Sequence, residues 1–384
     1  MSEAVIVDAV RTPVGIGKPG KGVLSETHPV DLSARVISAL VERTGIDPAL
    51  IDDVIWGCVS QVGEQGANIA RHAVLAAGLP ESVPGVTVDR QCGSSQQAIT
   101  FAAAAVMSGQ LDIVVAGGVE SMSRVPMFSN TVGGDGPYSH QLIRRYDDGL
   151  VHQGVSAEMI ADRWNLSRAY LDELAVASHE RAAAATDAGA FADEIIPVPT
   201  EEGTASVDQG IRRGTTSQAL AALPTPFQAD GVVTAGNASQ ISDGSAGVLV
   251  MTAERANDLG LTPMARIHTV ALAGVDPVIM LTGPIPATAK VLDRAGLRLA
   301  DIGAFEVNEA FASVLGAWLA DTGADHARVN PLGGAIALGH PLGASGARLT
   351  TTLVHHMRRT GTRFGLQTMC EGGGMANATI LELW

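Results

Sequence analysis

The stretch QCGSSQQAITFAAAAVMSGQLDIVVAGG, residues 91–118, has the features of a small-residue turn, a long helix and a buried strand that ends in paired glycines. The same succession returns late in the chain, where HPLGASGARLTTTLVHHMRRTG (340–361) is followed by FGLQTMCEGGG (364–374). Turns, helices and strands of similar length in both places indicate two copies of one α/β unit. The repeat predicts two halves that pack side by side.

Other segments support an α/β class. Strands are expected at 4–13, 51–63, 245–252 and 264–274, and helices at 29–45, 67–79, 156–189 and 284–297, the third of these interrupted near 165–167. Asp31 is expected to cap the helix at 29–45, and Gly45 to end it. Strands that alternate with helices predict an open sheet whose ligands bind at the carboxyl ends of the strands.

The amino-acid composition changes between residues 123 and 240, where polar and irregular segments such as PVPTEEGTASVDQGIRRGTTSQ (197–218) predominate. We expect an inserted loop domain at 123–240. The N-terminal half would then comprise 1–122 plus 241–265, and the C-terminal half 266–384.

Composition narrows the classes of partner. The 384 residues carry a formal net charge of −15 and contain no sizeable Lys/Arg cluster, so neither nucleic acid nor an anionic membrane is an expected partner. The sequence also lacks an uncharged apolar run long enough to span a bilayer. Only 17% of the residues are charged, which suits a large interior or a subunit interface.

The chain has three cysteines, Cys58, Cys92 and Cys370. This odd and sparse set argues against a disulfide framework and for a reducing compartment. The opening MSEAVIVDAVRTP lacks the basic region of a secretory signal, so we expect a cytoplasmic protein. Cys58 is assigned to the core.

Cys92 lies at the turn between a strand and a helix. Helix N-termini favour negative charge, so the helix start predicts a thiol that ionises more easily than usual. The alternative is a small buried core residue, and position alone does not decide between the two.

Three further positions have two interpretations each. His340 lies in GGAIALGHPLGASGA (333–347), whose glycines predict a tight loop close to a ligand, and it is either structural or a base for a cysteine. Cys370 is either a strand-end residue or an acid/base thiol, with the Gly372 N–H as an oxyanion donor. Asn308, beside Glu309 after a buried strand, either caps a helix or holds a water or carbonyl.

Together these residues resemble those of the thiolases, which are acyltransferases that cleave or form 3-oxoacyl-CoA. The likeness covers essentially the full length. Its motifs, in order, are DAVRTPVG (8–15), QCGSSQQA (91–98), GGVESMS (117–123), VTAGNASQISDG (233–244), GPIPA (283–287), VNEAF (307–311), NPLGGAIALGHPLGASGAR (330–348) and CEGGG (370–374).

The resemblance implies roles for individual residues. Cys92 would be the nucleophile, His340 its base, and His340 with a water held by Asn308 the first oxyanion hole. Cys370 would move the proton at the acetyl carbon, and the N–H groups of Cys92 and Gly372 would form the second oxyanion hole. Ser239, His152 and Met280 would line the pantetheine channel, and Arg212 would approach the CoA phosphates.

The resemblance also implies a five-layer α-β-α-β-α body that forms a homodimer or homotetramer, with CoA as a substrate and no permanently bound cofactor or metal. The second cysteine, in CEGGG, favours a thiolase over a ketoacyl synthase. The chain departs from the common thiolase sequence motifs at CGSSQQA, at HQG (152–154) and at LPTPF (223–227). It also lacks the basic loop of acetoacetyl-specific members, so we expect a degradative enzyme for longer or bulkier acyl groups.

Three alternatives remain open. The first is a synthetic acetyl-CoA acetyltransferase. The second is a silent acyl-CoA or lipid carrier, which the presence of Cys92, His340 and Cys370 disfavours. The third is an unrelated Cys-His hydrolase, which would need no second cysteine.

Overall fold

One continuous path of strands organises the computed structural model, which describes residues 2–146, 149–201 and 203–384. The strand order is β10-β11-β12-β9-β1-β8-β5-β3-β4, with β2 beside β8. These strands are β1 (Ala4–Arg11), β2 (Gly15–Ile16), β3 (Asp53–Gly57), β4 (Gly85–Val88), β5 (Ile113–Ser121), β8 (Ser242–Thr252), β9 (Ala265–Gly274), β10 (Ala304–Val307), β11 (Phe364–Glu371) and β12 (Met375–Leu383).

The path consists of two halves with the same pairing pattern. In the N-terminal half β3 runs parallel to β5, β5 antiparallel to β8, and β8 antiparallel to β1. In the C-terminal half β10, β11, β12 and β9 repeat these relations in the same order. The halves meet where Val5 and Ile6 of β1 pair with the start of β9. The predicted repeat is confirmed.

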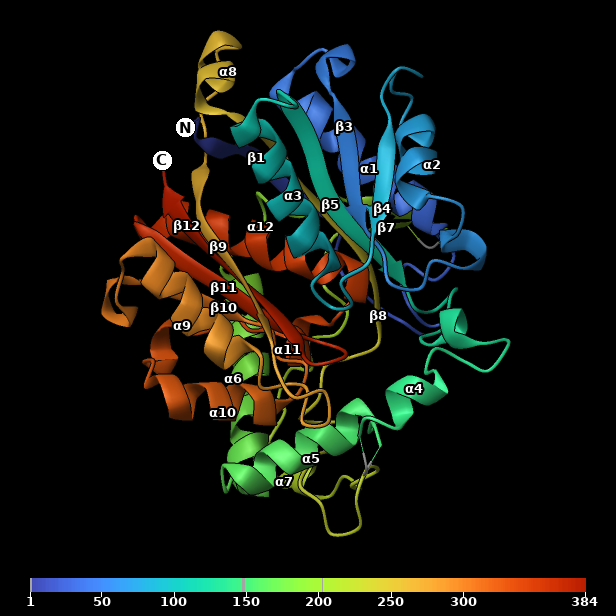
Figure 1. Ribbon diagram of the computed structural model, residues 1–384, viewed down its shortest axis with the longest axis vertical. Coiled ribbons are helices and arrows are strands. Elements are labelled where there is room, and N and C mark those ends of the chain that lie inside the picture. Colours follow the sequence, from blue (N-terminus) through green and yellow to red (C-terminus); the bar gives the residue numbers. More distant parts are fainter. Residues whose placement is uncertain (1, 147–148, 202) are drawn as a thin grey trace.

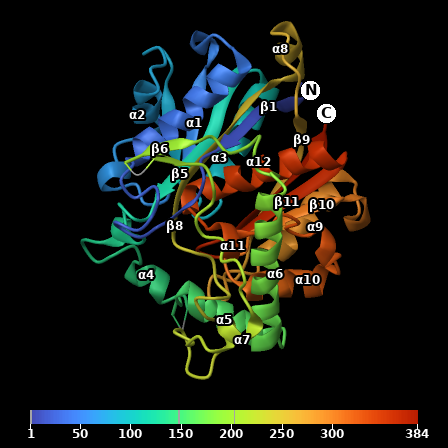
Figure 2. The same cartoon turned by 180° about the vertical axis from the view of Figure 1, so that it is seen from behind.

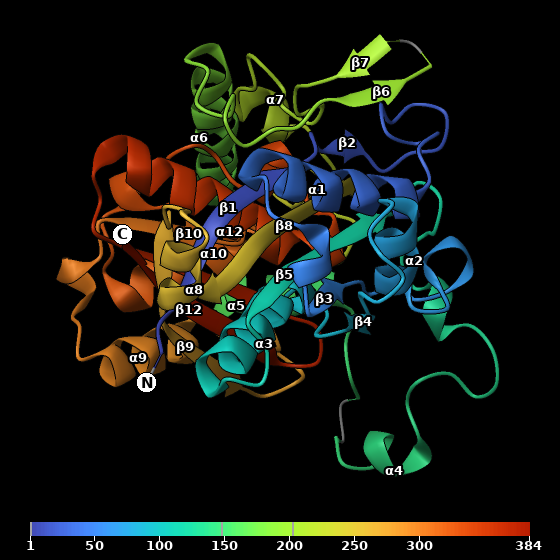
Figure 3. The same ribbon diagram turned by 90° about the horizontal axis from the view of Figure 1, so that it is seen from above.

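Helices complete five layers, which Figures 1 and 3 show from two directions. The helices of the two halves are α1 (Pro29–Thr44), α2 (Ile69–Ala76), α3 (Ser94–Ser108), α8 (Ala253–Asp258), α9 (Pro284–Ala295), α10 (Ala312–Thr322), α11 (Ala335–Leu338) and α12 (Leu342–Thr360). The pair α1 and α2 covers the outer face of one half, and α9 and α10 cover that of the other. Between the halves lie α3 and α12.

The central strands are buried on both faces. Val5 and Val115 pack toward α1 and α2, whereas Ile6 and Val114, one position away, pack toward α3 and α12. Successive side chains of a strand point to opposite faces, so a strand between two helical layers needs a continuous apolar run. This explains why runs such as IVVAGG (113–118) show no polar alternation.

Glycines let α12 approach the N-terminal half closely. A Cβ on Gly346 of α12 would lie 2.3 Å from the backbone nitrogen of Gln96 in α3, and one on Gly118 would lie 2.1 Å from the Gly343 oxygen. Any side chain at these positions would push the elements apart. The close packing brings the first turns of α3 and α12 together.

The segment between β5 and β8 leaves the sheet and returns to it. It carries α4 (His140–Ile143), α5 (Gln153–Arg163), α6 (Arg168–Asp187), β6 (Val198–Thr200), β7 (Gly203–Ala205) and α7 (Ser217–Ala221). Figure 2 shows α6 running along the C-terminal half. The break between α5 and α6 is confirmed, with Asn165 at a φ of 53°. We propose 123–240 as the inserted domain, on this departure and return.

Two local expectations are wrong. His28, and not Asp31, caps α1, because Pro29 begins the helix early and the Val30 N–H bonds to His28 Nδ1. The strand expected at 51–63 ends at Gly57, since the N–H groups of Val59 and Ser60 bond to the buried carboxylate of Glu120 and not to a neighbouring strand. The expected end of α1 is confirmed, with Gly45 at a φ of 67°.

Single-turn 3-10 segments occur at Pro48–Leu50, Gly63–Gln65, Ser129–Thr131, Leu299–Asp301 and His326–Arg328. Across the described residues, no helix combines the length and apolar character needed to cross a membrane.

Candidate active site

Four chain segments carry the main candidates to the ends of the central elements. Cys92 directly precedes the N-cap of α3, and His340 precedes α12 by two residues. Asn308 follows β10, and Cys370 is the penultimate residue of β11. All four side chains are buried.

The hydrogen bonds of His340 define its tautomer. Ser345 Oγ donates to the Pro341 carbonyl at 2.8 Å, so it accepts the proton of His340 Nδ1 at 2.6 Å. On the other side of the ring, Asn308 Nδ2 donates to Nε2 at 3.3 Å. The Nε2 lone pair therefore points toward the loop that follows β10. His340 can accept a proton there without changing its Nδ1 contact.

The electrostatic setting keeps His340 neutral. Burial, together with the positive charge of Arg348 in α12, lowers the pKa of His340 to about 3. Imidazole in this state is an acceptor at Nε2, not a fixed cation. The first requirement for a general base, an available lone pair, is met at neutral pH.

The expectation of an easily ionised Cys92 is wrong. Burial raises the pKa of the Cys92 thiol to about 12, and the carboxylate charge of Glu371 contributes to the rise. The nearby N–H groups of Cys92 and Gly372 oppose this rise in pKa, but burial outweighs them. Desolvation of a fully buried thiol exceeds the field of one helix terminus. The resting pair is thus a neutral thiol and a neutral imidazole.

A second thiol lies next to the first. Burial raises the pKa of Cys370, and negative charge on Cys92 and Glu371 raises it further, which places Cys370 within electrostatic reach of both. Two buried thiols and two N–H groups thus lie together at the start of α3, and α12, which follows the neutral His340, packs against this helix. This combination can form and break a thioester while it holds an oxyanion.

The expected channel residues lie around Ala310 and Phe311, which follow β10. Met280 shares an apolar cluster with Phe311 and Cys370. The Ser239 N–H donates to the Ala310 carbonyl at 2.9 Å. His152, at the start of α5, is exposed and stacks on Phe227 with ring centroids 5.5 Å apart; Phe227 in turn meets Phe311 edge-on.

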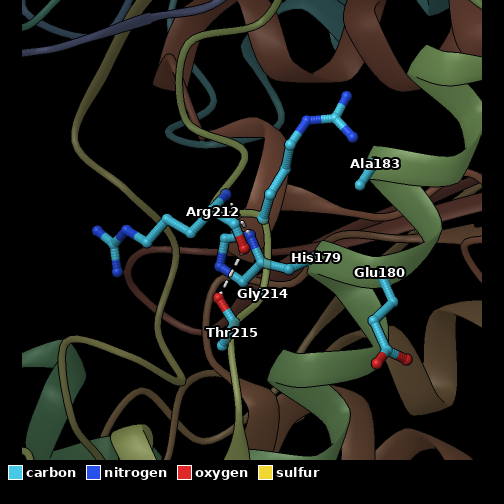
Figure 4. Close-up of a pocket in the computed structure, with 7 residues that line it drawn as sticks. His179, Glu180, Ala183, Arg212, Gly214 and Thr215 are labelled. Atoms are coloured by element: carbon cyan, nitrogen blue, oxygen red, sulfur yellow. Dashed lines mark hydrogen bonds between the residues drawn. The ribbon is translucent and has the colours of Figure 1, made fainter.

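Arg212 lies elsewhere, in a pocket of about 280 Å³ that none of the other candidate residues lines. Figure 4 shows it with His179, Glu180, Ala183, Arg213, Gly214 and Thr215. Its backbone N–H donates to His179 Nδ1 at 3.1 Å, and its carbonyl accepts from Thr215 Oγ1. The main chain is anchored while the guanidinium side is exposed.

Cys58 is a core residue, as expected. Asn308 and Glu309 do not cap a helix, since α10 begins at Ala312 with Phe311 as its N-cap. Glu309 instead bonds Ser178, Asn330 and the Ile336 N–H, so it ties β10 to α6 and α11.

Four further residues of this region were not expected from the sequence. Ser345 lies inside a motif of small residues, although its place one turn after His340 is a usable signal. Glu371 lies beside Cys370 in CEGGG, where only the cysteine suggests chemistry. Gln91 and Gln153 flank Gly372, whose added Cβ would lie 3.1 Å from Gln91 Oε1 and 3.2 Å from Gln153 Nε2.

Groups of His, Cys, Asp and Glu suited to a metal ion are absent from the described part of the chain.

Comparisons with known proteins agree on one family. Residues 4–254 match the family described as Thiolase, N-terminal domain, and residues 261–383 match Thiolase, C-terminal domain. The chain is 54% identical to the steroid 3-ketoacyl-CoA thiolase FadA6 of Mycobacterium tuberculosis, over all of this chain and 94% of that protein. It is 44% identical to the 3-ketoacyl-CoA thiolase of Bacillus subtilis, over the full length of both.

A solved structure is similar over the whole chain. The acetyl-CoA acetyltransferase of Bacillus anthracis superposes with a TM-score of 0.91 at 38% identity, covering 100% of this chain and 99% of that one. Fold and sequence therefore lead to the same assignment, and the chain belongs to the thiolase family of acyltransferases.

Proposed function

We propose that the enzyme cleaves a 3-oxoacyl-CoA with CoA, giving acetyl-CoA and a shortened acyl-CoA through an acyl group carried on Cys92. The observation that carries this proposal is a pair of buried thiols, Cys92 and Cys370, within electrostatic reach of each other. The helix α12, which follows the neutral His340, packs against α3, which follows Cys92. The names of the relatives in M. tuberculosis and B. subtilis support the degradative direction.

In the first half-reaction the Cys92 sulfur attacks the 3-oxo carbon while its proton passes to His340 Nε2. The bond between C2 and C3 then breaks, and its electron pair forms the enolate of acetyl-CoA. The Cys370 S–H donates its proton to C2. Acetyl-CoA leaves, Cys92 holds the acyl group as a thioester, and Cys370 is a thiolate.

In the second half-reaction Cys370 takes the proton of an incoming CoA thiol. The CoA sulfur attacks the thioester, and Cys92 departs as a thiolate that recovers its proton from His340 Nε2. Every proton is returned, so the cycle needs no external acid or base. An acyl-enzyme between two substrates predicts ping-pong kinetics.

Two sets of donors would stabilise the oxyanions. The Cys92 and Gly372 N–H groups, which lie near the resting thiol, would hold the oxygen of the attacked carbonyl. The other set is protonated His340 with a water on Asn308, whose Oδ1 is buried and has no partner among the described residues. One such donor is typically worth about 2.7–4 kcal/mol of transition-state stabilisation.

For the substrate we propose a bulky acyl group. The relative in M. tuberculosis is named a steroid 3-ketoacyl-CoA thiolase, and Gln153 lies in HQG, one of the motifs at which this chain departs from the common thiolase pattern. Ser239, His152 and Met280 would contact pantetheine, and Arg212 the CoA phosphates. Synthesis of acetoacetyl-CoA is the second candidate, favoured by the B. anthracis structure.

We further propose a cytoplasmic homodimer. The three cysteines are unpaired, as suits a reducing compartment. Strand β4 is an edge strand, and Val86 on it is 42% exposed; Phe101 and Met107 of the neighbouring helix α3 are exposed too. An exposed apolar sheet edge is a natural pairing surface.

The test is CoA-dependent cleavage of a 3-oxoacyl-CoA series from acetoacetyl to polycyclic acyl groups, with Cys92→Ser as the control. Activity that increases with acyl bulk and disappears in the variant supports the proposal. Turnover of acetoacetyl-CoA alone would replace it with the acetyl-specific enzyme. Binding of CoA esters without any cleavage would leave only the carrier.

A further inference from the structure

Glu371 follows Cys370 at the end of β11, where it pairs with Met375 across the hairpin to β12. Its side chain is fully buried, and neither carboxyl oxygen has a hydrogen-bond partner among the described residues. Leaving a carboxylate in this state is costly, because ionised groups lose much more than neutral ones when removed from water. Such a carboxyl needs either a partner or a proton.

The other half of the molecule shows what a purely structural glutamate looks like at this place. Glu120 is the penultimate residue of β5, the counterpart of β11. It is also buried, but it accepts hydrogen bonds from Val59 N, Ser60 N, Gln65 Nε2 and Gly343 N at 2.8–3.0 Å. The carboxyl group of Glu120 therefore has four hydrogen-bond donors, whereas that of Glu371 has none among the described residues.

The unpartnered carboxyl lies against the turn that holds the nucleophile. Its Oε1 is so close to Gly93 that an added Cβ there would lie 2.0 Å from it. Asn377 Nδ2 is the polar neighbour on β12, and it is already used by the Gly93 carbonyl at 3.2 Å. Negative charge on Glu371 acts directly on both cysteines.

Charged groups face Glu371 mainly from the turn between β4 and α3. Arg90 favours its ionised form, although Glu371 has no salt bridge among the residues that the structure describes, and Asp89 opposes that form. Cys92 and Cys370 face it from α3 and β11, and Asn377 from β12 carries no charge. Burial, the largest effect, raises the pKa of Glu371 to about 8.

We propose that Glu371 is a positioning residue of the thiolase centre, whose protonated carboxyl leaves the two cysteines free to carry negative charge and whose ionised form suppresses it. This deepens the proposed function and rests on Cys92 being the nucleophile. In the proposed cycle each cysteine is a thiolate once, so an extra negative charge beside them would slow both half-reactions.

The experiment measures alkylation of Cys92 by iodoacetamide from pH 6 to 10, with the modified residue identified by mass spectrometry. In the wild type, the logarithm of the rate should flatten near pH 8, as Glu371 ionises. In Glu371→Gln it should continue to rise with unit slope. The two rates should coincide at pH 6.5, and the variant should be about tenfold faster at pH 9.5, as for one pKa unit.

Two further variants complete the design. Glu371→Asp keeps an ionisable carboxyl, so its alkylation rate should flatten with pH as that of the wild type does. It replaces Glu371→Gln if the latter does not fold. Glu42→Gln removes one negative charge from the exposed face of α1 and should follow the wild type.

Parallel curves for the wild type and Glu371→Gln, or a variant that is faster at pH 6.5 as well, would overturn the inference, because the effect would then not follow the charge. Failure of the proposed function looks different. In that case Cys92→Ser would retain activity, whatever the alkylation curves show.

Discussion

Ser345 is the residue on which the chemistry of His340 depends most directly. By accepting the Nδ1 proton it leaves Nε2 as the acceptor, and its own proton is held by the Pro341 carbonyl. Both ring nitrogens are thereby assigned before substrate arrives. A residue that acts in this way should affect the rate of reaction more than binding.

Ser345→Ala should lower kcat by roughly tenfold to a hundredfold, part of what general base catalysis contributes, with KM little changed. The pH profile of kcat should also change, because the unheld imidazole can take either tautomer. Steady-state kinetics between pH 6 and 9 check this. Ser345→Thr, which keeps the hydroxyl, should restore much of the rate; equal losses in both variants would contradict the argument.

Sequence motifs nominated Cys92, His340 and Cys370 as candidates, but neither their electrostatic states nor the neighbours Ser345 and Glu371 were predictable. The position of Cys92 before a helix suggested an acidic thiol, whereas complete burial and Glu371 make it a weakly acidic one. Glu371 belongs to the same hairpin as Cys370, yet its orientation toward Gly93 depends on tertiary packing. Local sequence describes the helix terminus and says little about desolvation.

Among the secondary-structure elements, α12 is the one whose packing leaves least freedom. Glycine to alanine inside a helix usually stabilises by up to about 1 kcal/mol. At Gly346 the added methyl would meet backbone, the Gln96 nitrogen at 2.3 Å, so α3 and α12 would have to separate.

We therefore expect Gly346→Ala to destabilise the protein by about 1–3 kcal/mol, the usual range for overpacking. Urea unfolding followed by circular dichroism measures this. Gly316→Ala in α10 is the matched control, because its nearest neighbour is the end of the Leu166 side chain at 3.0 Å, which can move. Equal stability of the two variants would show that α12 can shift.

The edge strand β4 gives a second prediction for an element. Val86→Lys places a charge on the proposed pairing edge and should convert the dimer to a monomer without changing the circular dichroism spectrum. Light scattering coupled to size exclusion reports the mass. A wild-type monomer, or a variant that stays dimeric, would move the interface away from β4.

Element order was predictable from periodicity, and most strands and helices formed where expected. The exceptions depend on contacts distant in sequence. Strand β3 stops at Gly57 because Val59 and Ser60, which follow it, bind Glu120 of β5. Similarly, His28 replaces Asp31 as the cap of α1 because Pro29 sets where the helix begins.

For the whole molecule, buried carboxyls couple stability to pH. Burial raises the pKa of Glu306, and of Glu371, to about 8 in the folded state, against an ordinary value of 4.5. The unfolded chain therefore loses these protons first, and the folded state loses stability as the pH rises toward 8. Above pH 7 the buried His340, with its lowered pKa, is neutral in both states and has no effect.

The midpoint of urea unfolding should accordingly fall between pH 7 and pH 8.5. Glu371→Gln should flatten part of this slope, because the amide does not titrate. Equilibrium unfolding at three pH values in this interval is sufficient. A midpoint that is constant, or that rises with pH, would show that the two carboxyls are ionised in the folded protein.

The repeat in the strand order has a consequence for how the proposed catalytic groups are distributed between the two halves. Corresponding helices are preceded by different reactive side chains: α3 follows a cysteine, and α12 follows a histidine. Corresponding strands also end differently, since β11 supplies a thiol where β5 supplies none. Neither copy is a small enzyme in its own right. Each has specialised, and the proposed set of catalytic groups is complete only when the two halves pack together.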